Sequence, residues 1–104
     1  MKTIYKYPLF PARTTIKLPE HYKVLTVQSQ KNELFVWVEV DTDKPFDRMV
    51  YFDVYGTGRA IPDDPGSYIG TAQIYQGDLV WHVYAQGDAK TIPTWPAGGG
   101  IALC

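Results

Sequence analysis

The residue types that could do chemistry are concentrated in one short stretch of this chain, residues 55–66. The stretch reads YGTGRAIPDDPG and holds three glycines, two prolines, two aspartates and one arginine. Amides of the Gly56–Gly58 backbone, with Arg59 beside them, could form a nest for an anion such as phosphate. A dinucleotide fingerprint would need a third glycine in place of Ile61 and a helix after it, and the sequence predicts neither. We therefore expect a rigid connection that carries a contact surface, and anion binding is the alternative.

General base or nucleophilic chemistry has few candidate residues in the sequence. His82 sits among aromatic residues in a predicted strand, where a histidine is more often structural than catalytic. A triad of Ser67, His82 and either Asp63 or Asp64 can be drawn, but no nucleophile-elbow motif surrounds the serine. The other histidine, His21, is too distant in the sequence to complete a metal-ligand motif. The sequence therefore predicts no catalytic residue, no metal site, no cofactor and no enzymatic activity.

Predicted β-strands surround this stretch and must position its side chains. Apolar and polar residues alternate with a period of two through most of the chain, and turn residues interrupt the pattern at short intervals. The expected strands span residues 3–7, 14–18, 23–30, 33–40, 50–55, 69–75 and 79–85. Lys31-Asn32 and residues 76–78 read as hairpin turns, and residues 19–22 as a single helical turn. The pattern predicts an all-β fold, a small antiparallel sandwich or partly open barrel of about seven strands.

The two faces of the predicted strands differ in composition. One face carries aliphatic residues and is expected to form the core. The opposite face carries Phe35 and Trp37 on one strand, and Tyr51 and Tyr55 on another, together with acidic residues. Such a face can be a second packed layer covered by the terminal segments, or an exposed aromatic platform for a protein, peptide or base-like ligand. The sequence leaves both interpretations open.

Composition limits the classes of protein to which the chain can belong. Its 104 residues suit one domain, and its formal net charge of −1 argues against a dedicated nucleic-acid binder. The single cysteine, Cys104, cannot form an intramolecular disulfide, and no apolar stretch approaches the ~20 residues of a membrane-spanning helix. We expect a cytoplasmic protein that does not associate with membranes. Residues 1–87 are expected to form the domain, and the glycine- and proline-rich residues 88–104 a loose tail.

Five segments, in order along the chain, resemble a family of short uncharacterised proteins encoded mainly by bacteriophages and by bacteria with phage-like elements. They are IYKYPL at residues 4–9, YGTG at 55–58, IPDDP at 61–65, YIGT at 68–71 and VWHVY at 80–84. The resemblance covers about residues 1–85. A histidine often follows the Gly-Thr-Gly of that family, whereas this chain has Arg59. The resemblance implies a phage-related origin and no particular reaction.

Together these observations favour a binding protein over an enzyme. We expect a phage-derived accessory protein that binds a host or phage protein, such as a component of a host defence system that it inhibits. The alternatives are a module that sequesters a nucleotide or another anion, and a minor virion structural protein. The chain could also form a homodimer through its strand edges or its aromatic face. Arg59 and Trp95 are the expected anchors, because arginine and tryptophan dominate interface hot spots. The candidate binding residues are Tyr55, Gly56, Thr57, Gly58, Arg59, Asp63, Asp64, Trp37, Tyr51 and Trp95.

Overall fold

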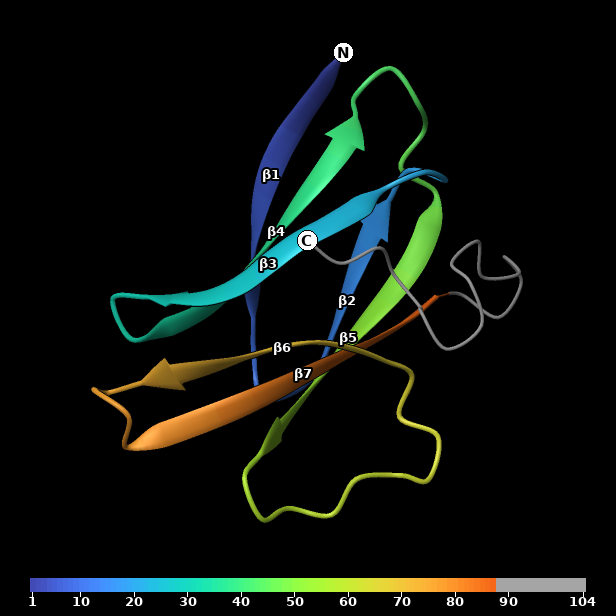
Figure 1. Ribbon diagram of the computed structural model, residues 1–104. Helices are drawn as coiled ribbons and strands as arrows, with labels where there is room; N and C mark the ends of the chain where they lie inside the picture. The colour runs from blue at the N-terminus through green and yellow to red at the C-terminus, as the bar shows by residue number, and fades with distance from the viewer. Residues whose placement is uncertain (88–104) are drawn as a thin grey trace.

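The computed structural model describes residues 1–87 and forms a β-sandwich (Figure 1). Its strands are β1 (Lys2–Leu9), β2 (Ala12–Leu18), β3 (Lys23–Gln30), β4 (Glu33–Asp41), β5 (Arg48–Gly56), β6 (Ser67–Ile74) and β7 (Leu79–Gly87). One sheet has three strands in the order β1-β4-β3, and the other has four in the order β2-β5-β7-β6. Each pair of neighbouring strands is antiparallel. The prediction of an all-β antiparallel sandwich is confirmed, and the predicted tail, residues 88–104, lies outside the described residues.

The alternating pattern of each strand places one face of each sheet in the core. In β4 the buried positions run from Leu34 to Val40 at every second residue. In β5 the aliphatic and aromatic positions from Val50 to Val54 are buried in the same way, and Phe52 is fully buried. These inner faces pack against each other and form one hydrophobic cluster. The prediction of an aliphatic core is therefore confirmed.

The two hairpins that end at the same side of the sandwich are tied together. Lys31 and Asn32 have φ values of 50° and 65° in the β3–β4 turn, as the favoured two-residue hairpin turn requires. The β6–β7 turn begins at Tyr75, whose φ is 54°. The amide of Tyr75 donates a hydrogen bond to Asn32 Oδ1 at 3.1 Å, so the tip of one sheet is linked to the tip of the other (Figure 1).

Residues 19–22 contain a bend at residues 20 and 21 and no helical turn, so the prediction of a helical turn there is wrong. This segment carries the chain from β2 in one sheet to β3 in the other. Pro19 is buried, and Arg48 Nη2 donates a hydrogen bond to Glu20 Oε1 at 2.6 Å. These tertiary contacts, which the local pattern does not reveal, fix the crossing. Pro8 also continues β1 instead of ending it, because an edge strand can accommodate a residue without an N–H group.

Candidate functional site

The loop between β5 and β6, residues 57–66, is fixed at both ends. The amide of Arg59 donates to the Gly56 carbonyl at 3.1 Å, and Gly58 occupies the third position of this turn with a φ of 84°. Gly66, at the other end, has a φ of 93°. A Cβ atom there would lie 2.6 Å from the carbonyl oxygen of Ala85 on β7. Packing therefore requires glycine at residue 66, and the Arg59–Gly56 hydrogen bond and this close approach to β7 define the two ends of the loop.

His82, on β7, links the loop to strand β6 through a chain of hydroxyl groups. Its Nε2 atom lies 2.8 Å from Thr57 Oγ1, and its Nδ1 atom lies 3.0 Å from Thr71 Oγ1. The Tyr68 hydroxyl lies 2.6 Å from the same Thr71 oxygen. Because a hydroxyl can donate or accept, both ring nitrogens are satisfied in either tautomer. The histidine thus holds the first residues of the loop against the sheet.

The triad that can be drawn from the sequence is not assembled. Within residues 1–87, His82 forms no hydrogen bond with Ser67, Asp63 or Asp64, since its two ring nitrogens face the threonine hydroxyls. The same part of the chain contains no cluster of three or more side chains suited to hold a metal ion. It also contains no helix that is long and apolar enough to cross a membrane. The contacts of His82 with Thr57 and Thr71 are those expected of the structural histidine that the sequence predicted.

Three tyrosines from three strands stack on the outer face of the four-stranded sheet. Tyr84 of β7 packs edge-to-face on Tyr55 of β5 and on Tyr68 of β6, with ring centroids 5.9 Å and 5.6 Å apart. Tyr68 is 47% exposed, and the other two are half-buried. Burial, followed by the nearby Asp53 carboxylate, raises the pKa of Tyr55 above its ordinary value. The three tyrosines therefore form a stack of rings in mutual contact, which we call the tyrosine face.

An ion pair between a buried aspartate and a half-exposed arginine borders the tyrosine face. Asp53, only 5% exposed, lies opposite Tyr84 in the β5–β7 register. Arg13 of β2 binds it with two hydrogen bonds, from Nε to Oδ1 at 2.7 Å and from Nη2 to Oδ2 at 3.0 Å. These bonds raise the pKa of the Arg13 guanidinium above its ordinary value. The same guanidinium lies 4.7 Å from the centroid of the Tyr51 ring, so the pair positions an aromatic side chain as well.

Two small hollows flank the loop. The first has a volume of ≈ 230 Å³ and lies between the loop and the tyrosine face. Its lining residues are Tyr55, Gly56, Thr57, Gly58, Arg59, Ile61, His82 and Tyr84. The second has a volume of ≈ 370 Å³ and lies on the side of the loop toward the β6–β7 hairpin. Its lining residues are Gly56, Thr57, Arg59, Asp78, Leu79, Val80 and Trp81.

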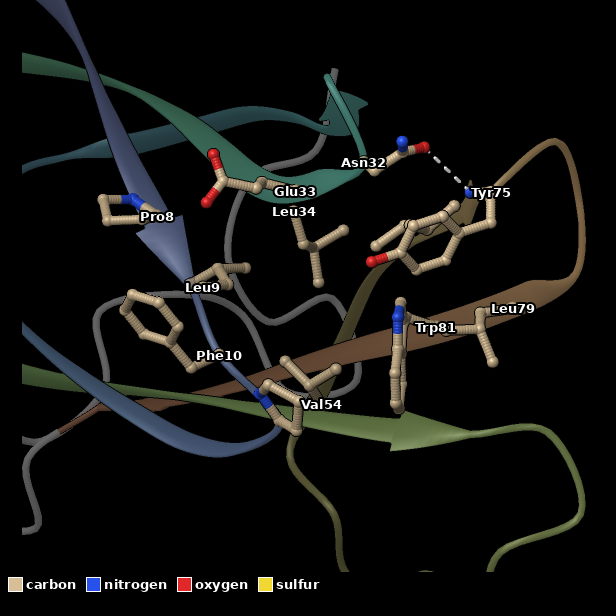
Figure 2. Close-up of a pocket in the computed structure, with 12 residues that line it drawn as sticks. Pro8, Leu9, Phe10, Asn32, Glu33, Leu34, Val54, Tyr75, Leu79 and Trp81 are labelled. Atoms are coloured by element: carbon tan, nitrogen blue, oxygen red, sulfur yellow. Dashed lines mark hydrogen bonds between the residues drawn. The ribbon is translucent and has the colours of Figure 1, made fainter.

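An apolar cleft opens between the sheets at the end where the two hairpins meet (Figure 2). We call it the end cleft, and its volume is ≈ 230 Å³. It is lined by the β1–β2 corner, the two hairpins, and residues of β5 and β7. These residues are Pro8, Leu9, Phe10, Pro11, Asn32, Glu33, Leu34, Val54, Ile74, Tyr75, Leu79 and Trp81. Phe10, Tyr75 and Leu79 are 57%, 52% and 41% exposed, so a large apolar surface borders the opening.

The structure brings half of the predicted binding residues together and separates the rest. Tyr55, Gly56, Thr57, Gly58 and Arg59 line one hollow. Tyr51 lies on the same sheet face under Arg13, whereas Trp37 lies on the outer face of the other sheet, on the opposite side of the molecule. Asp63 and Asp64 are exposed in the loop, and Trp95 lies outside the described residues. The single aromatic platform considered from the sequence is therefore two separate surfaces of half-buried rings.

Sequence reasoning missed four residues that complete the site, Arg13, Tyr68, Thr71 and Tyr84. Their strands were predicted, but nothing local indicates that β2 and β7 lie beside β5 or that β6 lies beside β7. The resemblance did quote the segments that contain three of them, residues 68–71 and 80–84. Sequence reasoning also missed the end cleft, because that cleft forms only where turns from both sheets meet. The available signal was a set of large apolar residues next to turns, such as Phe10 and Tyr75.

Comparison with known proteins supports the expected relationship to an uncharacterised family. Neither the curated proteins nor the solved structures contain a match to this chain. A family model described as a domain of unknown function, DUF7352, matches residues 1–93. This match includes all seven strands, the loop, both hollows and the end cleft. The chain therefore belongs to this family, the domain of unknown function DUF7352.

Proposed function

We propose that the protein is a non-enzymatic binding module that docks on another protein through the tyrosine face and the adjoining loop. One observation carries the proposal: ring stacking and a chain of hydroxyl contacts hold three tyrosines, a histidine and a loop threonine in one arrangement. Side chains that are already fixed lose less conformational entropy when a partner covers them. Tyrosine and arginine are also the residues that dominate the energetics of protein interfaces.

Arg59 suits the role of an anchor for a protein partner. Its side chain lines the first hollow and is exposed, and within residues 1–87 it forms no ion pair. Its amide already donates to Gly56, so that amide cannot also complete an anion nest. These features support protein docking over sequestration of a nucleotide or another anion.

The resemblance to phage-encoded proteins guides the choice of partner. The proposal is that this is a phage-derived accessory protein, that it acts in the host cytoplasm, and that its partner is a host or phage protein. A component of a host defence system that the protein inhibits is the first class to examine. A minor virion component would instead copurify with phage particles, and a homodimer would appear as a dimer in sedimentation.

Site-specific photo-crosslinking in bacterial cells tests this proposal. The crosslinking residue p-benzoylphenylalanine is introduced in place of Tyr68 on the tyrosine face, or in place of Trp37 on the opposite face. We expect one crosslinked protein from the Tyr68 position and none from the Trp37 position. Arg59→Glu and Tyr55→Ala should each weaken binding of that protein by at least about tenfold, as loss of a hot-spot residue does. Lys6→Glu, on the outer face of the three-stranded sheet, should leave binding unchanged.

Absence of any crosslinked protein at the Tyr68 position would count against the proposal, and two further results would contradict it. The first is a partner whose binding survives both Arg59→Glu and Tyr55→Ala. The second is a rise in melting temperature with a nucleotide at millimolar concentration that Arg59→Glu removes. A ligand that binds the folded state raises its apparent stability by mass action, so that rise would support the anion-binding alternative instead.

A further inference from the structure

The end cleft and the two hollows beside the loop adjoin one another. The end cleft shares Leu79 and Trp81 with the second hollow. The second hollow shares Gly56, Thr57 and Arg59 with the first. Because consecutive depressions have lining residues in common, they lie in a row from the tyrosine face, across the start of the loop, to the gap between the two sheets. We call this the composite groove.

Exposed apolar side chains are concentrated along the composite groove. Eight large hydrophobic residues are at least 41% exposed among those described. Three of them, Phe10, Tyr75 and Leu79, line the end cleft, and Ile61 lines the first hollow. Tyr68, a fifth, stacks on Tyr84 at the same hollow. A patch that gathers exposed apolar groups around a depression marks an interaction site, since such groups are otherwise scattered.

Polar groups at the end cleft are positioned to bind a polar backbone beside an apolar side chain. Figure 2 shows the Tyr75 hydroxyl directed into the cleft and the Trp81 ring standing across from it. Within residues 1–87, neither the Tyr75 hydroxyl nor the Trp81 indole N–H forms a hydrogen bond. Each can donate to a carbonyl group. The cleft therefore combines apolar walls with two donors that lack an acceptor in the described chain.

The middle of the composite groove carries one charge of each sign. Arg59 and Asp78 both line the second hollow, and neither forms an ion pair among the described residues. Arg59 also lines the first hollow, so its guanidinium is accessible from the side of the tyrosine face. An acidic group that approaches from this side meets the cation first. The charge at the junction of the two hollows therefore complements an acidic side chain.

We propose that the composite groove receives an extended peptide segment of the partner protein, with an aliphatic or aromatic side chain in the end cleft and an acidic side chain at Arg59. The proposal rests on the proposed function, because it specifies how the partner of that function is recognised. Small-molecule sites are usually single cavities of about 300–1,000 Å³ that enclose the ligand. Two of the three depressions are smaller than this and the third is at its lower end, and three open depressions in a row suit a chain whose side chains enter successive pockets, as extended peptides do.

A display library of random twelve-residue peptides, selected on the whole protein, tests the groove. We expect the enriched peptides to share an apolar residue followed or preceded, within four positions, by an acidic one. Leu79→Asp should weaken their binding at least tenfold, because it puts a carboxylate into the end cleft. Arg59→Gln should weaken binding of peptides with the acidic residue and spare those in which alanine replaces it. Lys6→Gln on the opposite face is the matched control, and it should have no effect.

Leu79 is 41% exposed, so the Leu79→Asp protein should fold, and an unchanged circular dichroism spectrum and melting temperature would verify this. Phe10→Asp, at a 57% exposed position on the other side of the cleft, provides a second variant in case the first does not fold. Enriched peptides that lack an apolar residue, or that bind Leu79→Asp or Phe10→Asp as well as the unmodified protein, would overturn the groove.

The outcome for the groove can be separated from the outcome for the proposed function. A cellular partner that depends on Tyr55 and binds Leu79→Asp normally would overturn the groove and leave the binding function in place. Peptides that lose affinity for Leu79→Asp would support the groove even if no partner is crosslinked at the tyrosine face. The absence of a crosslinked partner would count against the proposed function only.

Discussion

The two outer faces of the sandwich carry aromatic side chains at similar positions, but hold them differently. On the three-stranded sheet, Phe35 and Trp37 of one strand pack with their centroids 6.1 Å apart, and Lys6 lies 4.6 Å above the Phe35 ring. On the four-stranded sheet, the rings come from three strands, and the hydroxyl of Tyr68 belongs to a chain that reaches Thr57 in the loop. Aromatic content alone therefore does not distinguish a candidate interface from another outer sheet face. The connected arrangement does, because it fixes the surface before binding.

The loop that adjoins the tyrosine face depends most strongly on a single residue, Gly66. We expect Gly66→Ala to lower the free energy of unfolding by about 3 kcal/mol, the upper end of the cost of a strained backbone position. The added Cβ would meet both an unfavourable φ and the Ala85 carbonyl oxygen 2.6 Å away. Chemical denaturation measures this loss.

Gly58→Ala is the matched control for that loss. Gly58 also has a positive φ, 84°, but a Cβ there has no neighbouring atom within 4 Å. The backbone conformation alone then costs about 1 kcal/mol. Equal losses for the two substitutions would show that the contact with β7 does not fix the loop.

The Arg13–Asp53 ion pair allows a direct test of whether a charged group stabilises one outer face more than the other. Asp53→Asn should lower the free energy of unfolding by about 2 kcal/mol, the range for hydrogen bonds to a charged group. Arg13 stays hydrated because its side chain is 51% exposed, so the loss should be smaller than for a fully buried pair. Glu39→Gln changes the half-buried acid on the opposite face and should alter stability by less than about 0.5 kcal/mol. Similar losses in denaturation would mean that the faces are equivalent.

The hydroxyl chain through His82 should be visible in the exchange of the loop amides. His82→Phe removes the contacts with Thr57 and Thr71, so the free energy of unfolding should fall by about 1 kcal/mol. Amide hydrogens of residues 57–66 should exchange faster, because the loop loses its link to the sheet. Thr26→Val, which removes a 3.3 Å contact with Gln28 on the other face, should leave that exchange unchanged. Unaltered exchange in His82→Phe would show that the loop is held without the histidine.

The sequence predicts the strands well because their determinants are local. Alternation and turn residues located all seven strands, and the Lys31-Asn32 turn has the expected positive φ values. The helical turn at residues 19–22 was wrong because buried Pro19 and the Glu20–Arg48 hydrogen bond override the local pattern. Predicted strand ends differ from the observed ends by a few residues, as expected where pairing partners are unknown.

The same distinction applies to the candidate site. Some of its residues lie together because they are neighbours in the sequence, and others only because the fold brings distant strands together. Tyr55 through Arg59 lie together because they are consecutive in one turn. A single aromatic platform containing Trp37 and Tyr51 was one of two interpretations that the sequence left open, and the assignment of β4 and β5 to different sheets separates these residues. Arg13 reaches Asp53 across forty residues of sequence, and no local pattern marks that pairing. The sequence therefore indicated the loop residues of the candidate site, and the fold determines which residues from other strands lie beside them.

The smallest expected effect concerns the pKa values of two tyrosines, one from each sheet. Burial and then the Asp53 carboxylate raise the pKa of Tyr55, whereas burial and then Tyr5 raise the pKa of Tyr7 on β1. A tyrosine whose pKa is raised by folding contributes stability that is present below its ordinary pKa. That stability is lost as the pH rises through the raised value. Alkaline destabilisation should therefore include a contribution from each tyrosine.

Asp53→Asn should separate these two contributions. It removes the negative charge that disfavours the Tyr55 phenolate, so the pKa of Tyr55 should fall toward its ordinary value while that of Tyr7 stays where it is. Titration of the tyrosine Cζ resonances by NMR measures both groups in one sample. A pKa of Tyr55 that does not move would assign its shift to burial alone. A parallel fall at Tyr7 would indicate a change in the whole sandwich instead of a field confined to the tyrosine face. Because Arg13 remains nearby and favours the phenolate, a local field predicts a fall only at Tyr55.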